Sequence, residues 1–132
     1  MIFIDTNVII SYVNEDDSKH SEAKLLLKNI IEGDFGEYII SDYIFDETVT
    51  ICELRVNKDE SIRLGNFLFE NLNIIKITDK LFSDSWKIFK ENNKLSFTDC
   101  SNIAIMKAFG IKKIATFDKS FNKIKDIEII SQ

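Results

Sequence analysis

Residues 2–10, with the sequence IFIDTNVII, join a short apolar run to a helical pattern through one acidic residue, Asp5. The apolar residues before Asp5 are uninterrupted, which is typical of a buried strand. After Asp5, apolar side chains recur at helical spacing, at Val8, Ile9, Tyr12 and Val13. The stretch therefore predicts a strand over residues 2–5 that leads directly into a helix, which is the beginning of a βα unit.

The same alternation of strand and helix continues along the rest of the chain. Short apolar runs predict four further strands, at residues 37–41, 74–78, 113–117 and 127–131. Periodic segments between them predict helices, the last of which is closed by Gly110. Strands joined through helices are expected to lie parallel, with helices on both faces of the sheet. We therefore expect a three-layer α/β/α sandwich with a mainly parallel sheet of four or five strands, formed by residues 1–132 as one domain.

Apolar stripes on the expected helices indicate which faces are buried. On the helix over residues 58–72, Gly65 is a weak point within such a stripe. Phe82, Trp86 and Phe89 recur at i, i+4 and i+7, and core packing is the ordinary explanation for this spacing. We therefore predict that the aromatic stripe packs in the core. The helix that begins at Ser18 carries another stripe, formed by Ala23, Leu26, Leu27, Ile30 and Ile31.

The composition excludes several classes of protein. The hydrophobic share is 45% and the charged share 30%, both ordinary for a globular chain. Because the apolar runs are short and interrupted by charges, we expect no membrane span and no secretory signal, and we expect a cytoplasmic protein. Cys52 and Cys100 lack metal-ligand spacing, so we interpret both as buried, reduced thiols. The net charge of −5 opposes simple binding of nucleic acid unless bound cations reverse the local sign.

Four acidic residues occupy the positions where a parallel α/β sheet carries its chemistry. Asp5 ends the first strand and Asp118 closely follows the fourth, so both should lie beyond the carboxyl ends of the strands. Glu47 and Asp99 lie in the first two turns of helices that adjoin the same rim. Carboxylates held close together repel one another unless a cation neutralises them, and hard oxygen ligands suit Mg²⁺ or Mn²⁺. The four acids therefore predict a metal site.

Each of these acids also has an ordinary structural explanation. Ser96 and Asp99 have the spacing of a helix capping box, and Asp5 can cap the first helix. Asp118 can shape the turn that follows the fourth strand, and Glu47 can be an exposed helical acid. The joint placement around one rim favours a shared site, since the sequence contains no competing nucleophile arrangement and no glycine-rich phosphate loop.

Other polar residues near these acids are weaker candidates. Thr6 and Asn7 begin the first helix, where they can either cap it or hold a phosphate or a metal-bound water. Thr116 ends the fourth strand and can support the site or simply bond to the backbone. His20 is distant in sequence from the acids, and we favour a structural role for it. A group of lysines can contact an RNA backbone, although a solvated surface is the ordinary alternative; it comprises Lys112, Lys113, Lys119, Lys123 and Lys125.

Five stretches of the sequence together resemble the PIN-domain nucleases, and within them the VapC-like toxins of toxin–antitoxin systems. IFIDTNVII at 2–10 resembles the first strand and first acid of that family, and DDSKHSEAKLLL at 16–27 resembles its second helix. The glutamate, the third acid and the fourth acid correspond to SDYIFDETVTI at 41–51, SFTDCSNIAIMKAFG at 96–110 and IATFDKSF at 114–121. The order and the approximate intervals agree nearly from end to end.

The resemblance implies a nuclease that hydrolyses RNA phosphodiester bonds with Mg²⁺ or Mn²⁺. Asp5 and Asp99 would be the main ligands of the principal metal, and Asp118 would complete that site or hold a second ion. Glu47 would act on the nucleophile directly or through a bound water. The implied partners are an RNA substrate, a second copy of the chain in a homodimer, and a cognate antitoxin that inserts a segment along the groove and blocks the metal site.

Other hypotheses share all or part of this pattern. A PIN nuclease that processes RNA without being a toxin would have identical acids. A noncatalytic PIN scaffold would bind RNA or protein, but the intact set of four acids argues against it. A phosphoryl-accepting receiver domain needs paired acids after its first strand, where this sequence has only Asp5. We therefore expect a metal-dependent endoribonuclease that is the toxin of a toxin–antitoxin pair.

Overall fold

The computed structural model describes residues 1–132 and contains one sheet of five parallel strands. Their order across the sheet is β3-β2-β1-β4-β5, so the first strand lies at the centre. The central strand is buried along its whole length, whereas the two edge strands are partly exposed. The strands are β1 (Ile2–Ile4), β2 (Tyr38–Ser41), β3 (Asn73–Ile75), β4 (Lys113–Ala115) and β5 (Glu128–Ile130).

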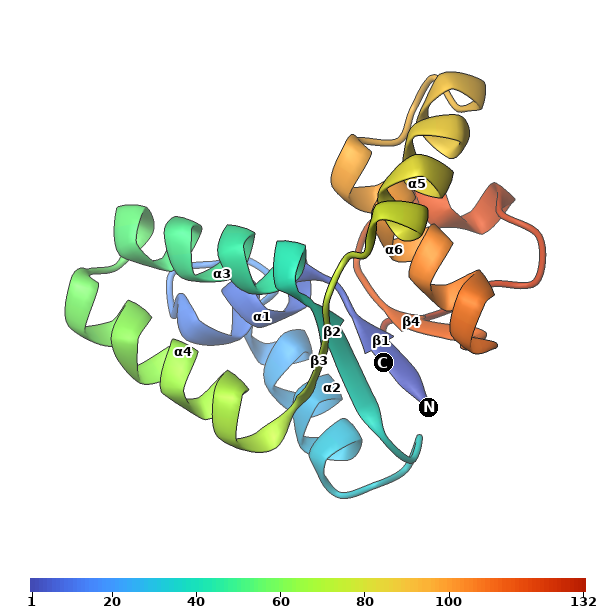
Figure 1. Cartoon of the computed structure of the whole chain (residues 1–132). Coiled ribbons are helices and arrows are strands. Elements are labelled where there is room, and N and C mark those ends of the chain that lie inside the picture. The colour runs from blue at the N-terminus through green and yellow to red at the C-terminus, as the bar shows by residue number, and fades with distance from the viewer.

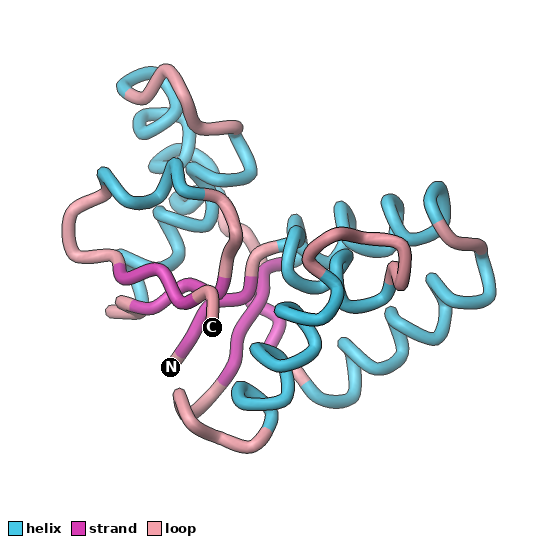
Figure 2. The backbone as a smooth tube through the Cα atoms, turned by 180° about the vertical axis from the view of Figure 1, so that it is seen from behind, coloured by secondary structure: helices cyan, strands magenta, loops and turns pink.

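Six α-helices cover the two faces of the sheet. The first four pack on one another on one side, and the last two pair on the other side (Figure 1), as the view from behind also shows (Figure 2). The predicted three-layer α/β sandwich is therefore confirmed. The helices are α1 (Thr6–Val13), α2 (His20–Ile31), α3 (Asp42–Arg55), α4 (Lys58–Asn71), α5 (Asp79–Glu91) and α6 (Phe97–Phe109), and a short 3-10 helix, η1 (Lys119–Lys123), follows β4.

All five predicted strands are present, each one or two residues shorter than its apolar run. After β1 and after β3, a polar side chain accepts a hydrogen bond from a backbone N–H group that follows the strand. The Asp5 carboxylate accepts a hydrogen bond from Thr6 N at 2.9 Å, which begins α1. The Asp42 carboxylate accepts one from Ile77 N at 3.2 Å, after β3 has left the sheet. A pattern of apolar residues does not predict such hydrogen bonds, and so it does not predict where these strands end.

The predicted core is confirmed for the sheet and for α2. Phe3 of β1 is fully buried, and so are Leu26 and Ile30 of the α2 stripe, although Ile31 is 51% exposed. Cys52 and Cys100 are buried and unbonded, as predicted.

The aromatic stripe of α5 is not in the core, so the prediction for it was wrong. Phe82, Trp86 and Phe89 are 53%, 50% and 37% exposed. Their rings instead gather around Phe97 at the start of α6, with centroid separations of 5.5 to 6.4 Å. The physical reason is that α5 buries Leu81 and Ser85, while its aromatic side is covered only in part, by Phe97 of α6.

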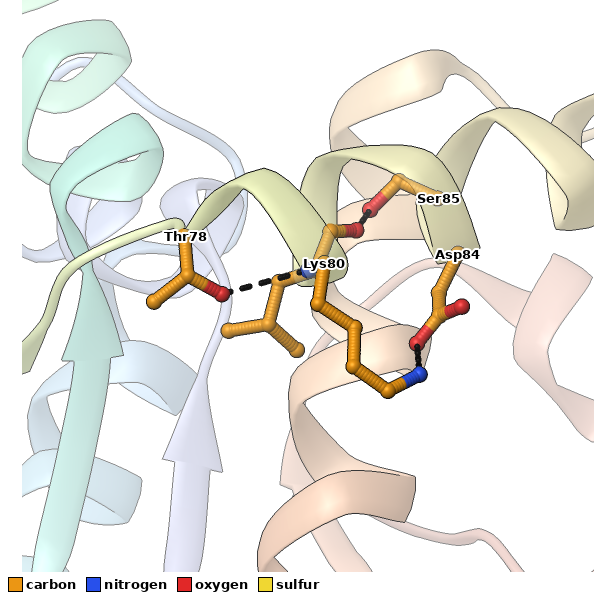
Figure 3. Close-up of polar contacts among 5 residues, drawn as sticks. Thr78, Lys80, Asp84 and Ser85 are labelled. Carbon is orange, nitrogen blue, oxygen red and sulfur yellow. Dashed lines mark hydrogen bonds and ion pairs between the residues drawn. The ribbon is translucent and has the colours of Figure 1, made fainter.

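The start of α5 is fixed by short-range contacts, which Figure 3 shows. Thr78 caps the helix, because its hydroxyl accepts a hydrogen bond from Leu81 N at 3.2 Å. Ser85 Oγ donates to the Leu81 carbonyl at 2.6 Å, and Lys80 Nζ pairs with Asp84 at 2.8 Å. The exposed aromatic face therefore belongs to a helix with well-defined local structure.

Two other helices differ in detail from the expectation. α2 begins at His20 rather than at Ser18, because a turn precedes it in which Asp17 Oδ1 accepts a hydrogen bond from Lys19 N at 2.8 Å. α4 runs unbroken through Gly65, which is buried against α3. None of the helices combines the length and the apolar character that crossing a membrane requires.

Candidate active site

A cavity of about 290 Å³ beyond the carboxyl ends of the central strands is lined by all four predicted acids. Asp5 follows β1 and Asp118 follows β4, and these strands are neighbours in the sheet, so the topology brings the two acids together. Glu47 enters from the second turn of α3, and Asp99 from the first turn of α6. Thr6 and Asn7 also line the cavity.

Asp5 is the most deeply buried of the four acids, with only 5% of its surface exposed. Its Oδ1 accepts a hydrogen bond from Thr6 N at 2.9 Å. Its Oδ2 accepts from Thr116 Oγ1 at 2.8 Å and from Asn7 Nδ2 at 3.1 Å. A buried carboxylate with this many donors is held in one orientation.

Thr116 is the centre of a hydrogen-bond network that joins the ends of β1 and β4. Besides donating to Asp5, its hydroxyl accepts from Asn7 Nδ2 at 3.0 Å and from Asp118 N at 3.0 Å. The Asn7 side chain also accepts a hydrogen bond from Phe117 N at 3.0 Å. Thr116 and Asn7 therefore support the acids, and neither has the purely local role that the sequence left open.

Three of the four acids also cap helices, as the structural alternative predicted. Besides Asp5 on α1, Asp118 Oδ1 accepts a hydrogen bond from Ser120 N at 2.9 Å. Asp99 Oδ2 accepts from Ser96 N at 3.1 Å within a complete capping box. In both Asp99 and Asp118 the second carboxylate oxygen makes no hydrogen bond within the protein. Capping and ligand binding are therefore compatible in these residues, because they use different oxygens.

Burial raises the pKa values of Asp5, Glu47 and Asp99, and repulsion by neighbouring acids adds to the effect. Burial is the main reason why the pKa of Asp5 rises to about 7; the hydrogen bond from Thr116 opposes this rise, and the charge of Asp99 adds to it. The pKa of Glu47 is raised by burial and then by Asp99, with the Thr98 hydroxyl opposing. The pKa of Asp99 is raised by burial and by Asp118. A cation in the cavity would relieve this accumulation of negative charge.

The residues of the cavity fit a hard divalent cation by their chemistry. They offer carboxylate oxygens, including one on Asp99 and one on Asp118 that have no hydrogen-bond partner, and the buried Thr6 hydroxyl also lacks a partner. No three acidic, histidine or cysteine side chains converge on one point in the present arrangement. Binding an ion would therefore require side chains such as Asp99 and Asp118 to turn their free oxygens inward.

The remaining predicted residues lie outside the cavity. His20 Nδ1 donates to the Ser11 carbonyl at 3.0 Å, and the ring lines an apolar groove, which confirms its structural role. Among the lysines near the last strands, Lys119 lines a hollow that also includes Asp118. Lys113 instead lies over the ring of Phe35, 5.7 Å from its centroid. Lys113 and Lys119 therefore do not lie together beside the acids.

Sequence reasoning missed two charged residues in the wall of the cavity, Asp17 and Arg55. Arg55 could have been found from spacing, because Glu47, Ile51 and Arg55 stand at i, i+4 and i+8 on α3 and all three line the cavity. Asp17 lies in the turn between α1 and α2, and no pattern in the sequence marks it.

Comparison with known proteins agrees with this geometry. The sequence model of the PIN-domain family matches residues 2–127 of this chain. This chain belongs to the PIN-domain family. The resemblance inferred from the sequence is thereby confirmed, and the cavity of this PIN domain contains the acids on which that resemblance rested.

Individual PIN proteins match over nearly their whole length. Ribonuclease VapC6 of Methanocaldococcus jannaschii is 29% identical, over 99% of this chain and 97% of the relative. The crystal structure of Mycobacterium tuberculosis VapC20, described as a toxin that cleaves the sarcin-ricin loop, has a TM-score of 0.85 at 21% identity and covers 95% of both chains. A toxin–antitoxin complex from Klebsiella pneumoniae has a TM-score of 0.72 at 19% identity, covering 97% of this chain and 96% of the other.

Proposed function

We propose that this PIN-domain chain is an endoribonuclease that depends on Mg²⁺ or Mn²⁺ and is the toxin of a toxin–antitoxin pair. The observation that carries the proposal is the cavity lined by Asp5, Glu47, Asp99 and Asp118. Burial and mutual repulsion disfavour the charged carboxylates there, and a bound cation would stabilise them. The ribonuclease and toxin names of the relatives support RNA as the substrate.

Each acid has a proposed role, which the resemblance to PIN-domain nucleases implies and its surroundings allow. Asp5 and Asp99 would be the main ligands of the ion, and Asp118 would complete the site through its free oxygen. A bound cation would lower the pKa of its water and stabilise the charge that develops on the phosphate. Thr116 and Asn7 hold the Asp5 carboxylate in place, and the Thr6 hydroxyl is free to bond to a water or to a phosphate oxygen.

Glu47 is the proposed general base. Its carboxylate makes no cap, and its raised pKa makes it a stronger base than an ordinary glutamate for taking a proton from an attacking water. The water oxygen bonds to phosphorus, the bond from phosphorus to the 3′ oxygen breaks, and that oxygen takes up a proton. The products would be a 5′ phosphate and a 3′ hydroxyl.

Cleavage of a defined RNA panel tests this proposal. The native chain should cleave with Mg²⁺ or Mn²⁺ and not with excess EDTA. Asp99→Asn should lower the rate by more than about 100-fold, because it removes a charged ligand and leaves a side chain that can still cap. Asp84→Asn, on α5 and outside the cavity, is the matched control and should cleave at the native rate. Equal rates in all three proteins would contradict the proposal.

The aromatic face of α5 is the proposed homodimer surface. Phe82, Trp86 and Phe89 form a contiguous exposed patch around Phe97, and a second copy would remove it from water. Analytical ultracentrifugation should find a native dimer that Trp86→Lys dissociates. Phe109→Lys is the control, because Phe109 is also 50% exposed and lies at the far end of α6. Dimers that persist in Trp86→Lys would exclude this surface.

An antitoxin partner separates the toxin proposal from an RNA-processing PIN nuclease. The structural neighbour from Klebsiella pneumoniae is a toxin–antitoxin complex, which supports a protein inhibitor for this chain. The product of a small adjacent gene should bind the chain and stop RNA cleavage. If no adjacent gene product inhibits cleavage, the processing hypothesis is favoured, with the same acids and the same chemistry.

A further inference from the structure

α3 presents one stripe of side chains to the acid cavity. Glu47, Ile51 and Arg55 stand at i, i+4 and i+8 on this helix, and all three line the same hollow. The wall of the cavity contains five acids, and Arg55 is its only basic residue. A single cation in so acidic a wall requires an explanation.

Arg55 has no partner within the protein. No carboxylate oxygen lies within 4.0 Å of its guanidinium, and the side chain makes no hydrogen bond. Arg63, the other arginine of the chain, pairs with Glu60 at 3.0 Å. The planar fork of Arg55 therefore keeps all its donors free, and this fork is suited to two parallel hydrogen bonds with a phosphate.

A purely structural role for Arg55 would have a different signature. The residue lies in the last turn of α3, where any positive charge interacts favourably with the helix dipole. That interaction depends on charge alone, so a lysine at this position would stabilise the helix equally well. It does not require the side chain to line the cavity of the acids.

The distance from Glu47 indicates which phosphate Arg55 would contact. Eight residues correspond to about 12 Å along a helix axis. We propose that Arg55 binds a phosphate of the RNA strand that flanks the cleaved one, and so fixes how the strand lies across the acid cavity. This inference rests on the proposed ribonuclease function. The contact matters because the net charge of −5 otherwise repels the RNA backbone.

Steady-state cleavage of a short single-stranded RNA tests the contact. Arg55→Gln should lower kcat/KM by about 10- to 100-fold, the effect expected for a lost charge-assisted hydrogen bond. Arg55→Lys keeps the charge at the helix end and should melt like the native protein, yet cleave less efficiently because the fork is lost. Arg63→Gln, which removes an arginine outside the cavity, should match the native kcat/KM.

The salt dependence of RNA binding provides a readout that a structural role would not change. Binding is measured with Ca²⁺ in place of Mg²⁺, and gels verify that the RNA stays intact. The slope of log Kd against log salt should fall by about 0.7 in Arg55→Gln, the value for one phosphate contact on a single strand, and should be unchanged in Arg55→Lys.

Two results would overturn the inference, and they are distinguishable. If Arg55→Gln has the native kcat/KM and the native salt slope while the native chain cleaves RNA, Arg55 has only a helix-end role and the proposed function stands. If the native chain itself neither binds nor cleaves RNA with Mg²⁺ or Mn²⁺, the proposed function is wrong and the inference is overturned with it.

Discussion

The four acids come together in one cavity, whereas the aromatic stripe of α5 lies on the surface. Both were identified in the sequence, the acids as one site and the stripe as part of the core, and only the first of these expectations agrees with the structure. Parallel neighbouring strands end at one edge of a sheet, so topology alone brings residues such as Asp5 and Asp118 together. The burial of a helix face depends instead on what packs opposite it, and spacing within the helix does not specify that.

The largest effect should come from the charge of Asp5 in the metal-free protein. The folded protein holds a proton on Asp5 up to about pH 7, while the unfolded chain releases it near its ordinary pKa of 3.8. Raising the pH through this window therefore disfavours folding, and the free energy of unfolding should fall by about 4 kcal/mol. Urea denaturation in EDTA at pH 4 and pH 7.5 measures the change.

Asp5→Asn is the variant that isolates this contribution from other titrating groups. It removes the titration, so its free energy of unfolding should vary less with pH than that of the native protein. The variant should also equal or exceed the native stability in EDTA at pH 7.5. An identical pH dependence in the two proteins would show that Asp5 is not the group responsible.

The two faces of α5 can be compared through neighbouring residues. Leu81 is 6% exposed and Phe82 is 53% exposed. Leu81→Ala should cost about 3 kcal/mol, because it leaves a cavity in the packed face, whereas Phe82→Ala should cost about 1 kcal/mol or less. Denaturation is measured at a concentration where both variants are monomeric. Equal costs would mean that the aromatic side of α5 is packed as tightly as the buried side.

The smallest expected effect is on stability, and it separates helix capping from metal binding at Asp99. Ser96→Ala breaks the capping box but leaves the Asp99 carboxylate, so it should cost about 1 kcal/mol of stability. RNA cleavage should remain close to native at a temperature where the variant is folded. Thermal melting and a cleavage assay on the same sample provide the comparison with Asp99→Asn. Loss of cleavage in folded Ser96→Ala would mean that the cap itself is required for activity.

Local sequence predicted the features that depend on a few neighbouring residues. The five strands, the capping box of Ser96 and Asp99, and the end of α6 at Gly110, where the backbone adopts φ 68°, all follow from short-range chemistry. The acids of the cavity followed from their places beyond the carboxyl ends of parallel strands and in the first turns of adjoining helices. The sequence offered two roles for Thr116 and could not decide between them, because its bonds to Asp5 and Asn7 join residues more than 100 positions apart. The exposure of Trp86 depends on how much of it another element covers, which no local pattern reports.

Binding of Mn²⁺ or Mg²⁺ to the metal-free protein tests the central claim most directly. At pH 7.5 the ion should raise the Tm of the native chain, with a stabilisation of about 2.7 kcal/mol at a hundred times Kd. Asp84→Asn should respond like the native chain, while Asp5→Asn and Asp99→Asn should respond weakly or not at all. The assignment of the four carboxylates as a metal site would be contradicted if neither ion raised the Tm of the native protein. It would also be contradicted if an ion stabilised Asp99→Asn as strongly as the native protein.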